Sequence, residues 1–118
     1  MAIHTNLPIY KVTYDLFSLV TQITRNMPRD FRASVGGKIR DECVDLLVLI
    51  YRANSSEDKV PHLTALLERL QVTELLLRLS RDMHFISTKQ YAQCIAQTNN
   101  IGKQANGWRK ASASSPVA

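Results

Sequence analysis

Apolar residues recur at helical spacing along most of the chain. The first series advances by three and four residues in turn: Ile9, Val12, Leu16, Leu19 and Ile23. Such spacing is typical of a helix that presents one apolar seam to a bundle. We therefore predict a first helix that is capped by Asn6, has Pro8 in its first turn and ends near positions 27–28.

A second helix is predicted to begin between positions 28 and 31 and to run to about Ala53. Its apolar stripe consists of Val35, Ile39, Cys43, Leu46 and Ile50. Val44 and residues 46–51 are apolar and cover most of the helix circumference. A helix of this kind requires burial on more than one side.

Two further helices follow the polar turn at positions 54–58. Pro61 suits the first turn of a third helix that reaches about Met83, and its leucines again exceed one narrow stripe. Ser87 and Gln90 have the spacing of a capping box, which predicts that a fourth helix starts there and runs to about Lys110.

Four helices of about 20 residues joined by short turns predict an all-α, antiparallel, up-down-up-down four-helix bundle. We expect residues 1–110 to form this single domain and the Ser/Ala-rich residues 111–118 to form a disordered tail. The excess apolar surface of the second and third helices predicts a partner, most simply another copy of the chain.

Nothing in the sequence favours catalysis. Cys43 and Cys94 are far apart, belong to no metal-binding motif and sit on apolar stripes, so we expect buried, reduced thiols. No Glu-x-x-His pair is present and no histidine has a recognisable nucleophile partner. We predict a protein without catalytic residues, metal or cofactor. The absence of a signal peptide and of a long apolar run predicts a cytoplasmic protein that does not enter membranes.

The charge is unevenly placed. Lys and Arg total 15 against 10 Asp and Glu, a net charge of +5, and no acidic residue follows Asp82. A second basic group surrounds the turn between the first two helices. Cations of this kind contact phosphate backbones, with a simply solvated helix face as the alternative. The candidate nucleic-acid contacts are Arg25, Arg29, Arg32, Lys38, Arg40, Arg78, Arg81 and Lys103.

For two residues that could contact nucleic acid, a role within the fold is the alternative. Arg78 and Asp82 are four residues apart on the third helix, so they are expected to form an ion pair. Trp108 has cations beside it and could stack on a base, but packing of the last helix against its neighbours is the better expectation.

Several short motifs occur in a characteristic order. They are Leu7-Pro8-Ile9-Tyr10-Lys11, Tyr14-Asp15-Leu16, Met27-Pro28-Arg29, Gly36-x-Lys38, Leu49-Ile50-Tyr51-Arg52-Ala53-Asn54, Arg78-Leu79-x-x-Asp82 and Gly107-Trp108. With them the chain resembles the accessory variability determinant (Avd) proteins of diversity-generating retroelements. The wider family is similar to four-helix-bundle proteins encoded in intervening sequences of bacterial large-subunit ribosomal RNA genes.

The resemblance implies a basic homopentamer that binds the retroelement's reverse transcriptase and RNA or DNA, and that assists mutagenic copying of RNA into cDNA. The alternative is an oligomeric four-helix-bundle scaffold that docks other proteins and does not bind nucleic acid.

Overall fold

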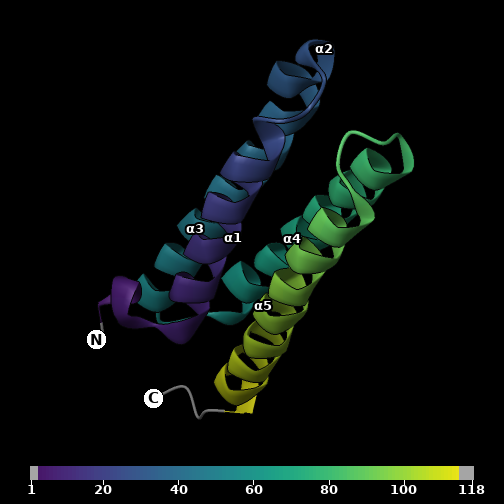
Figure 1. The fold of residues 1–118 in the computed structure, drawn as a ribbon. Coiled ribbons are helices and arrows are strands. Elements are labelled where there is room, and N and C mark those ends of the chain that lie inside the picture. The colour runs from purple at the N-terminus through teal and green to yellow at the C-terminus, as the bar shows by residue number, and fades with distance from the viewer. Residues whose placement is uncertain (1–2, 115–118) are drawn as a thin grey trace.

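The computed structural model describes residues 3–114 of the chain, and this part is helical almost throughout (Figure 1). The four long helices are α1 (Pro8–Thr24), α3 (Gly37–Ser55), α4 (Val60–Asp82) and α5 (Thr88–Ser114). Three short elements complete the order: the 3-10 turn η1 (His4–Asn6), the one-turn α2 (Arg29–Phe31) and the π-helical turn η2 (Arg32–Gly36).

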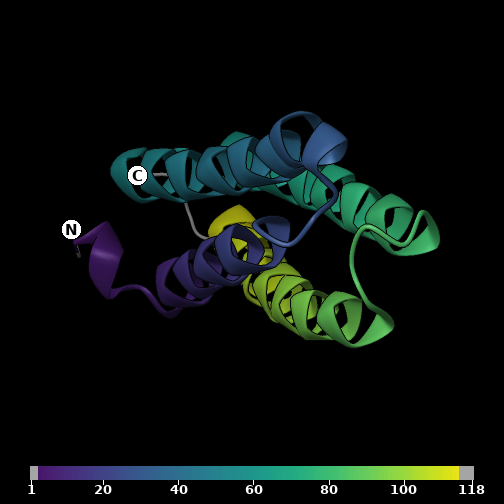
Figure 2. The same ribbon diagram turned by 45° about the horizontal axis from the view of Figure 1, so that its top comes forward.

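Successive long helices run in opposite directions. Helices α1 and α4 each pack against both α3 and α5, so the order around the bundle is α1, α3, α4, α5. Figure 1 shows α1 beside α3 and α4 beside α5, and Figure 2 shows α1 lying alongside α5. The result is an elongated molecule of 52 × 20 × 19 Å. The predicted all-α, up-down-up-down four-helix bundle is confirmed.

The core follows the predicted stripes. Leu16 on α1, Leu46 and Ile50 on α3, and Leu66 on α4 are all fully buried. Trp108 near the end of α5 packs against this core, as expected. Burial of such side chains is the main favourable contribution to folding. None of the described helices is long and apolar enough to cross a membrane.

The start and end of α1 differ from our prediction. Leu7 rather than Asn6 is the N-cap, and no side chain caps the helix. Asn6 instead closes the 3-10 turn, with its N–H bonded to the Ile3 carbonyl. At the other end, α1 stops at Thr24. The N–H groups of Asn26 and Met27 there bond to the carbonyl oxygens of Ile23 and Thr24, three residues back instead of four.

The predicted second helix is not continuous. It is divided into α2, the π-helical turn and α3, and at this division the backbone lies close to α1. A Cβ atom at Gly36 would lie only 3.1 Å from the Thr24 Cβ atom. The wider π-helical turn therefore leads into a close contact that only glycine fits without displacing a neighbour.

The capping box at the start of α5 is confirmed. The Ser87 hydroxyl accepts the Gln90 N–H at 3.0 Å, and the Gln90 side-chain oxygen accepts the Ser87 N–H at 2.9 Å. The helix ends at Ser114 rather than Lys110, where the Ser114 hydroxyl donates to the Lys110 carbonyl oxygen. Alanine favours helix at positions 111 and 113. The rest of the predicted tail, 115–118, lies outside the described residues.

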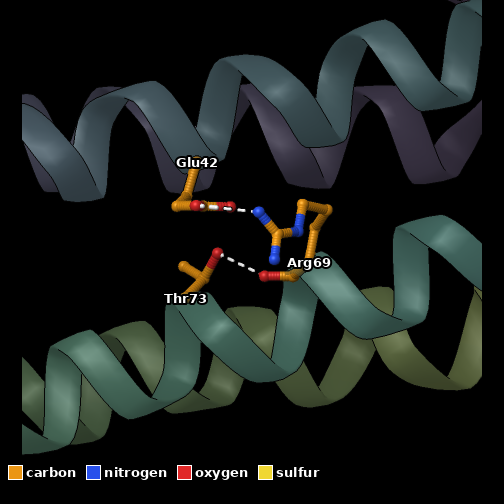
Figure 3. Close-up of polar contacts among 3 residues, drawn as sticks. All are labelled: Glu42, Arg69 and Thr73. Carbon is orange, nitrogen blue, oxygen red and sulfur yellow. Dashed lines mark hydrogen bonds and ion pairs between the residues drawn. The ribbon is translucent and has the colours of Figure 1, made fainter.

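One ion pair lies between α3 and α4. Figure 3 shows the side chains of Glu42 and Arg69 pointing toward each other, with Nη1 and Oε1 3.3 Å apart. The Thr73 hydroxyl donates to the Arg69 carbonyl oxygen at 2.9 Å, one turn along the same helix. The pair thus links α3 to α4.

Candidate nucleic-acid interface

The turn between α1 and α3 and the turn between α4 and α5 meet at the same end of the bundle. Phe31 from the first turn stacks on Phe85 from the second, with ring centroids 4.2 Å apart and planes at 23°. We call this end, formed by residues 25–38 and 81–89, the tip. It is the upper end in Figure 1.

Three predicted contacts are exposed on the first of these turns. Arg25 follows the last residue of α1, Arg29 begins α2 and Arg32 begins the π-helical turn. Arg32 donates to the Met27 carbonyl oxygen at 3.4 Å. Within residues 3–114, the side chains of Arg25 and Arg29 make no hydrogen bond or ion pair, so both guanidinium groups remain available to an anion.

The two predicted cations of α3 differ in their environment. Lys38 is exposed. Arg40 is half-buried, and its Nη1 donates to the Thr24 hydroxyl at 2.8 Å. Arg40 therefore ties α3 to the end of α1. It adds positive charge to this end of the bundle, while one of its donors is already engaged.

The predicted pair between Arg78 and Asp82 is wrong. Asp82 instead pairs with its neighbour Arg81, whose Nη2 and Nε lie 2.9 and 3.2 Å from one carboxylate oxygen. The Arg81 guanidinium also sits 4.3 Å above the Tyr91 ring of α5, which holds it beside Asp82. Arg78 is left exposed, whereas Arg81 is engaged in joining the two helices.

Lys103 is separated from the other candidates. It lies 15 residues beyond Thr88 on α5, roughly 22 Å along the helix at about 1.5 Å per residue. Lys89, which our list omitted, is exposed on the first turn of α5 and belongs to the tip. The lack of acidic residues after Asp82 was the signal that could have found it.

Lys103 lines a groove of about 650 Å³ between α4 and α5. Gly102 of α5 lies on one wall of this groove and Thr64 of α4 on the other. Glu74 on α4 faces the same groove, and burial raises its pKa. The groove thus contains both positively and negatively charged side chains. No sequence motif predicted this groove.

The two cysteines are free thiols inside the bundle. Cys43 and Cys94 are fully buried, as expected. Burial raises their pKa values to about 12 and about 11, which keeps both thiols protonated and unreactive near neutrality. Within the part of the chain that the structure describes, no three His, Cys, Asp or Glu residues are grouped to hold a metal ion.

A family model described as bAvd-like matches residues 7–112, from the N-cap of α1 into the last turn of α5. The chain belongs to the bAvd-like family. This match confirms the resemblance to the Avd proteins that the sequence motifs indicated. The matched residues include parts of all four long helices and the whole tip. The Avd family consists of non-catalytic accessory proteins. No curated protein matches the sequence.

Proposed function

We propose that the protein is a non-catalytic, cytoplasmic accessory subunit of a diversity-generating retroelement that binds nucleic acid and the reverse transcriptase. Family membership supports the accessory role. The observation that supports nucleic-acid binding is the tip, where Arg25, Arg29 and Arg32 are exposed and close together in sequence. Each phosphate that a cation neutralises releases counterions and adds to affinity at low salt.

The test replaces these three arginines by glutamine. We expect the triple variant to keep its fold and to lose affinity for RNA and DNA. The slope of log affinity against log salt should become less steep by about 0.7–0.9 for each lost phosphate contact. Anisotropy of a labelled RNA hairpin and of a DNA duplex, measured over a salt series, gives both quantities.

A matched control removes the same charge from the opposite end of the bundle. Lys11, Arg52 and Lys110 are exposed there, and glutamine at all three lowers the net charge equally. If the proposal is right, this control retains most of the affinity. Equal losses in both triple variants would show that net charge alone attracts nucleic acid and that the tip is no specific site.

We further propose that the protein acts as a homo-oligomer, with the family resemblance indicating a pentamer. Two outward faces support this. On α3, Val44, Val48 and Tyr51 are 39–52% exposed. A second face is formed by Leu75 and Leu79 on α4 together with Met83, the residue that caps the C-terminal end of this helix. Residues spaced by three and four lie on one side of a helix, so each set forms a continuous apolar strip.

Leu79→Glu tests this assembly, because Leu79 is 50% exposed and the monomer core does not need it. We expect this variant to remain folded and to form a smaller assembly, which light scattering would show as a lower molar mass. Leu76→Glu is the comparison. Since Leu76 packs against the core, this change should lower the stability of the chain itself. An unchanged mass for Leu79→Glu would remove the α4 face from the interface.

The same apolar faces favour a second candidate function, an oligomeric scaffold that docks other proteins. A stable oligomer with no measurable affinity for RNA or DNA at about 50 mM salt would favour the scaffold.

A further inference from the structure

The tip carries an aromatic pair among its arginines. Phe85 packs against the core, and its N–H is bonded to the Ser80 carbonyl at 2.8 Å. Phe31 stacks on it from the other turn, yet 39% of Phe31 remains exposed. Phe85 therefore supports Phe31 from the side of the core. Phe31 stacks on it and remains partly exposed to solvent.

The backbone of α2 holds this ring in place. The N–H groups of Phe31 and Arg32 both bond to the Pro28 carbonyl oxygen, at 2.9 and 3.1 Å. The position of Phe31 is thus set from two sides, by its own turn and by the ring of Phe85. A ligand that stacked on it would find the surface already formed, which lowers the entropic cost of binding.

Two cations flank Phe31 in the sequence. Arg29 precedes Phe31 by two residues and Arg32 follows it directly, and both are exposed. Arg29 and Arg32 are three residues apart, so they are neighbours on one side of the turn. The acidic Asp30 lies between them in sequence, and the Asp82 carboxylate of the other turn is already paired with Arg81.

We propose that the tip binds single-stranded nucleic acid, with an unpaired base stacked on Phe31 and the adjacent phosphates on Arg29 and Arg32. An exposed aromatic ring on a positively charged surface is the arrangement by which proteins hold unpaired bases, because every base has a flat face. Bases within a duplex are stacked on one another and are not free to make this contact. The inference rests on the proposed function and adds the kind of strand that this site selects.

The experiment compares Phe31→Leu with the wild-type protein. Anisotropy is measured with an unstructured 12-nucleotide oligo-U, with oligo-dT and with a 12-base-pair duplex. We expect Phe31→Leu to weaken binding of the single strands by roughly fivefold to a hundredfold and to leave duplex binding within about twofold. Its salt slope should equal that of the wild type, because stacking releases no counterions.

Two variants serve as controls. Phe31→Tyr keeps the ring and should bind single strands as the wild type does. Tyr14→Leu removes a ring that is 51% exposed on α1 away from the tip, and it should change nothing. A thermal melt of Phe31→Leu shows whether its fold is retained.

Phe31→Trp provides a second readout, since the fluorescence of a tryptophan stacked on a base is quenched. The wild-type protein, whose single tryptophan is Trp108, provides the baseline. Quenching of Phe31→Trp by oligo-U beyond this baseline supports the proposal even if the leucine variant unfolds.

Three results would overturn the proposal. The first is a folded Phe31→Leu variant that binds single strands like the wild type. The second is an equal loss for single strands and duplex. The third is a leucine variant that loses affinity only for vesicles of phosphatidylserine and phosphatidylcholine, which would make the tip a membrane contact. If the wild type binds no nucleic acid at low salt, the proposed function itself fails, whereas a steep wild-type salt slope with no effect of Phe31→Leu rejects the stacking site alone.

Discussion

Arg69 Nη1 lies 3.3 Å from Glu42 Oε1, and this contact joins α4 to α3 (Figure 3). The two partners differ in burial, since the Glu42 side chain is 8% exposed and that of Arg69 is 42% exposed. Glu42 Oε2 is buried and has no hydrogen-bond partner among the described residues. The arginine is thus the partner that makes burial of this carboxylate tolerable.

Replacing Arg69 by Met should lower the free energy of unfolding by about 1–2 kcal/mol, because it leaves Glu42 buried without its cation. The exposed position of Arg69 keeps this value below that of a fully buried pair. Urea unfolding measures the loss. Adding Glu42→Leu to the same variant should restore most of the stability, and a single variant as stable as the wild type would show that the pair contributes nothing.

Ser87→Ala should destabilise the bundle by about 1 kcal/mol, since the N–H of Gln90 loses its acceptor at the start of α5. Ser87→Asp keeps an acceptor at the same place and serves as the control. Thermal unfolding followed by circular dichroism compares the two. The interpretation of the capping box fails if alanine and aspartate have the same effect.

Gly36 and Gly37 are adjacent helical glycines that should respond differently to alanine. A Cβ atom at Gly37 meets only the Arg40 Nη2 atom, at 3.6 Å, so Gly37→Ala should raise stability by about 0.5–1 kcal/mol through helix propensity. Alanine at Gly36 places a Cβ atom 3.1 Å from the Thr24 Cβ atom, so Gly36→Ala should not raise stability. Chemical denaturation of both variants tests the difference, and equal gains would contradict the close contact between α1 and η2.

The two buried thiols make stability depend on pH in the alkaline range. In the native protein the pKa values of Cys43 and Cys94 are raised to about 12 and about 11, from an ordinary value of 9.0. Well below pH 9 the thiols are neutral in both the native and the unfolded state, and the stability that they contribute is fully present. As the pH rises above 9, thiols ionise first in the unfolded chain, so this contribution is progressively lost toward pH 11–12.

Urea unfolding at pH 8 and pH 10.5 measures this effect, with the Cys43→Ala, Cys94→Ala double variant as the reference. The wild type should lose more stability between the two pH values than the double variant does. A thiol reagent at pH 8 should also react slowly with the native protein and rapidly in urea. Fast reaction of the native protein would contradict the burial of the thiols.

The sequence by itself determined the fold class and the core. Residues such as Leu16, Ile39 and Ile50 recur at helical spacing, and that period depends only on local geometry, so the buried faces follow from it. The Ser87–Gln90 capping box is equally local, since both of its bonds span three residues. The clustering of Arg25, Arg29 and Arg32 around one turn was likewise evident from the charges alone.

Only the tertiary structure decided which of these groups are free and which are engaged. Arg40 bonds to Thr24, a residue 16 positions away, and Arg81 lies over Tyr91 of the next helix. Phe31 and Phe85 come together because the fold places two distant turns at one end. Contacts of this kind depend on how whole helices pack, and helical spacing says nothing about partners that are far apart in sequence.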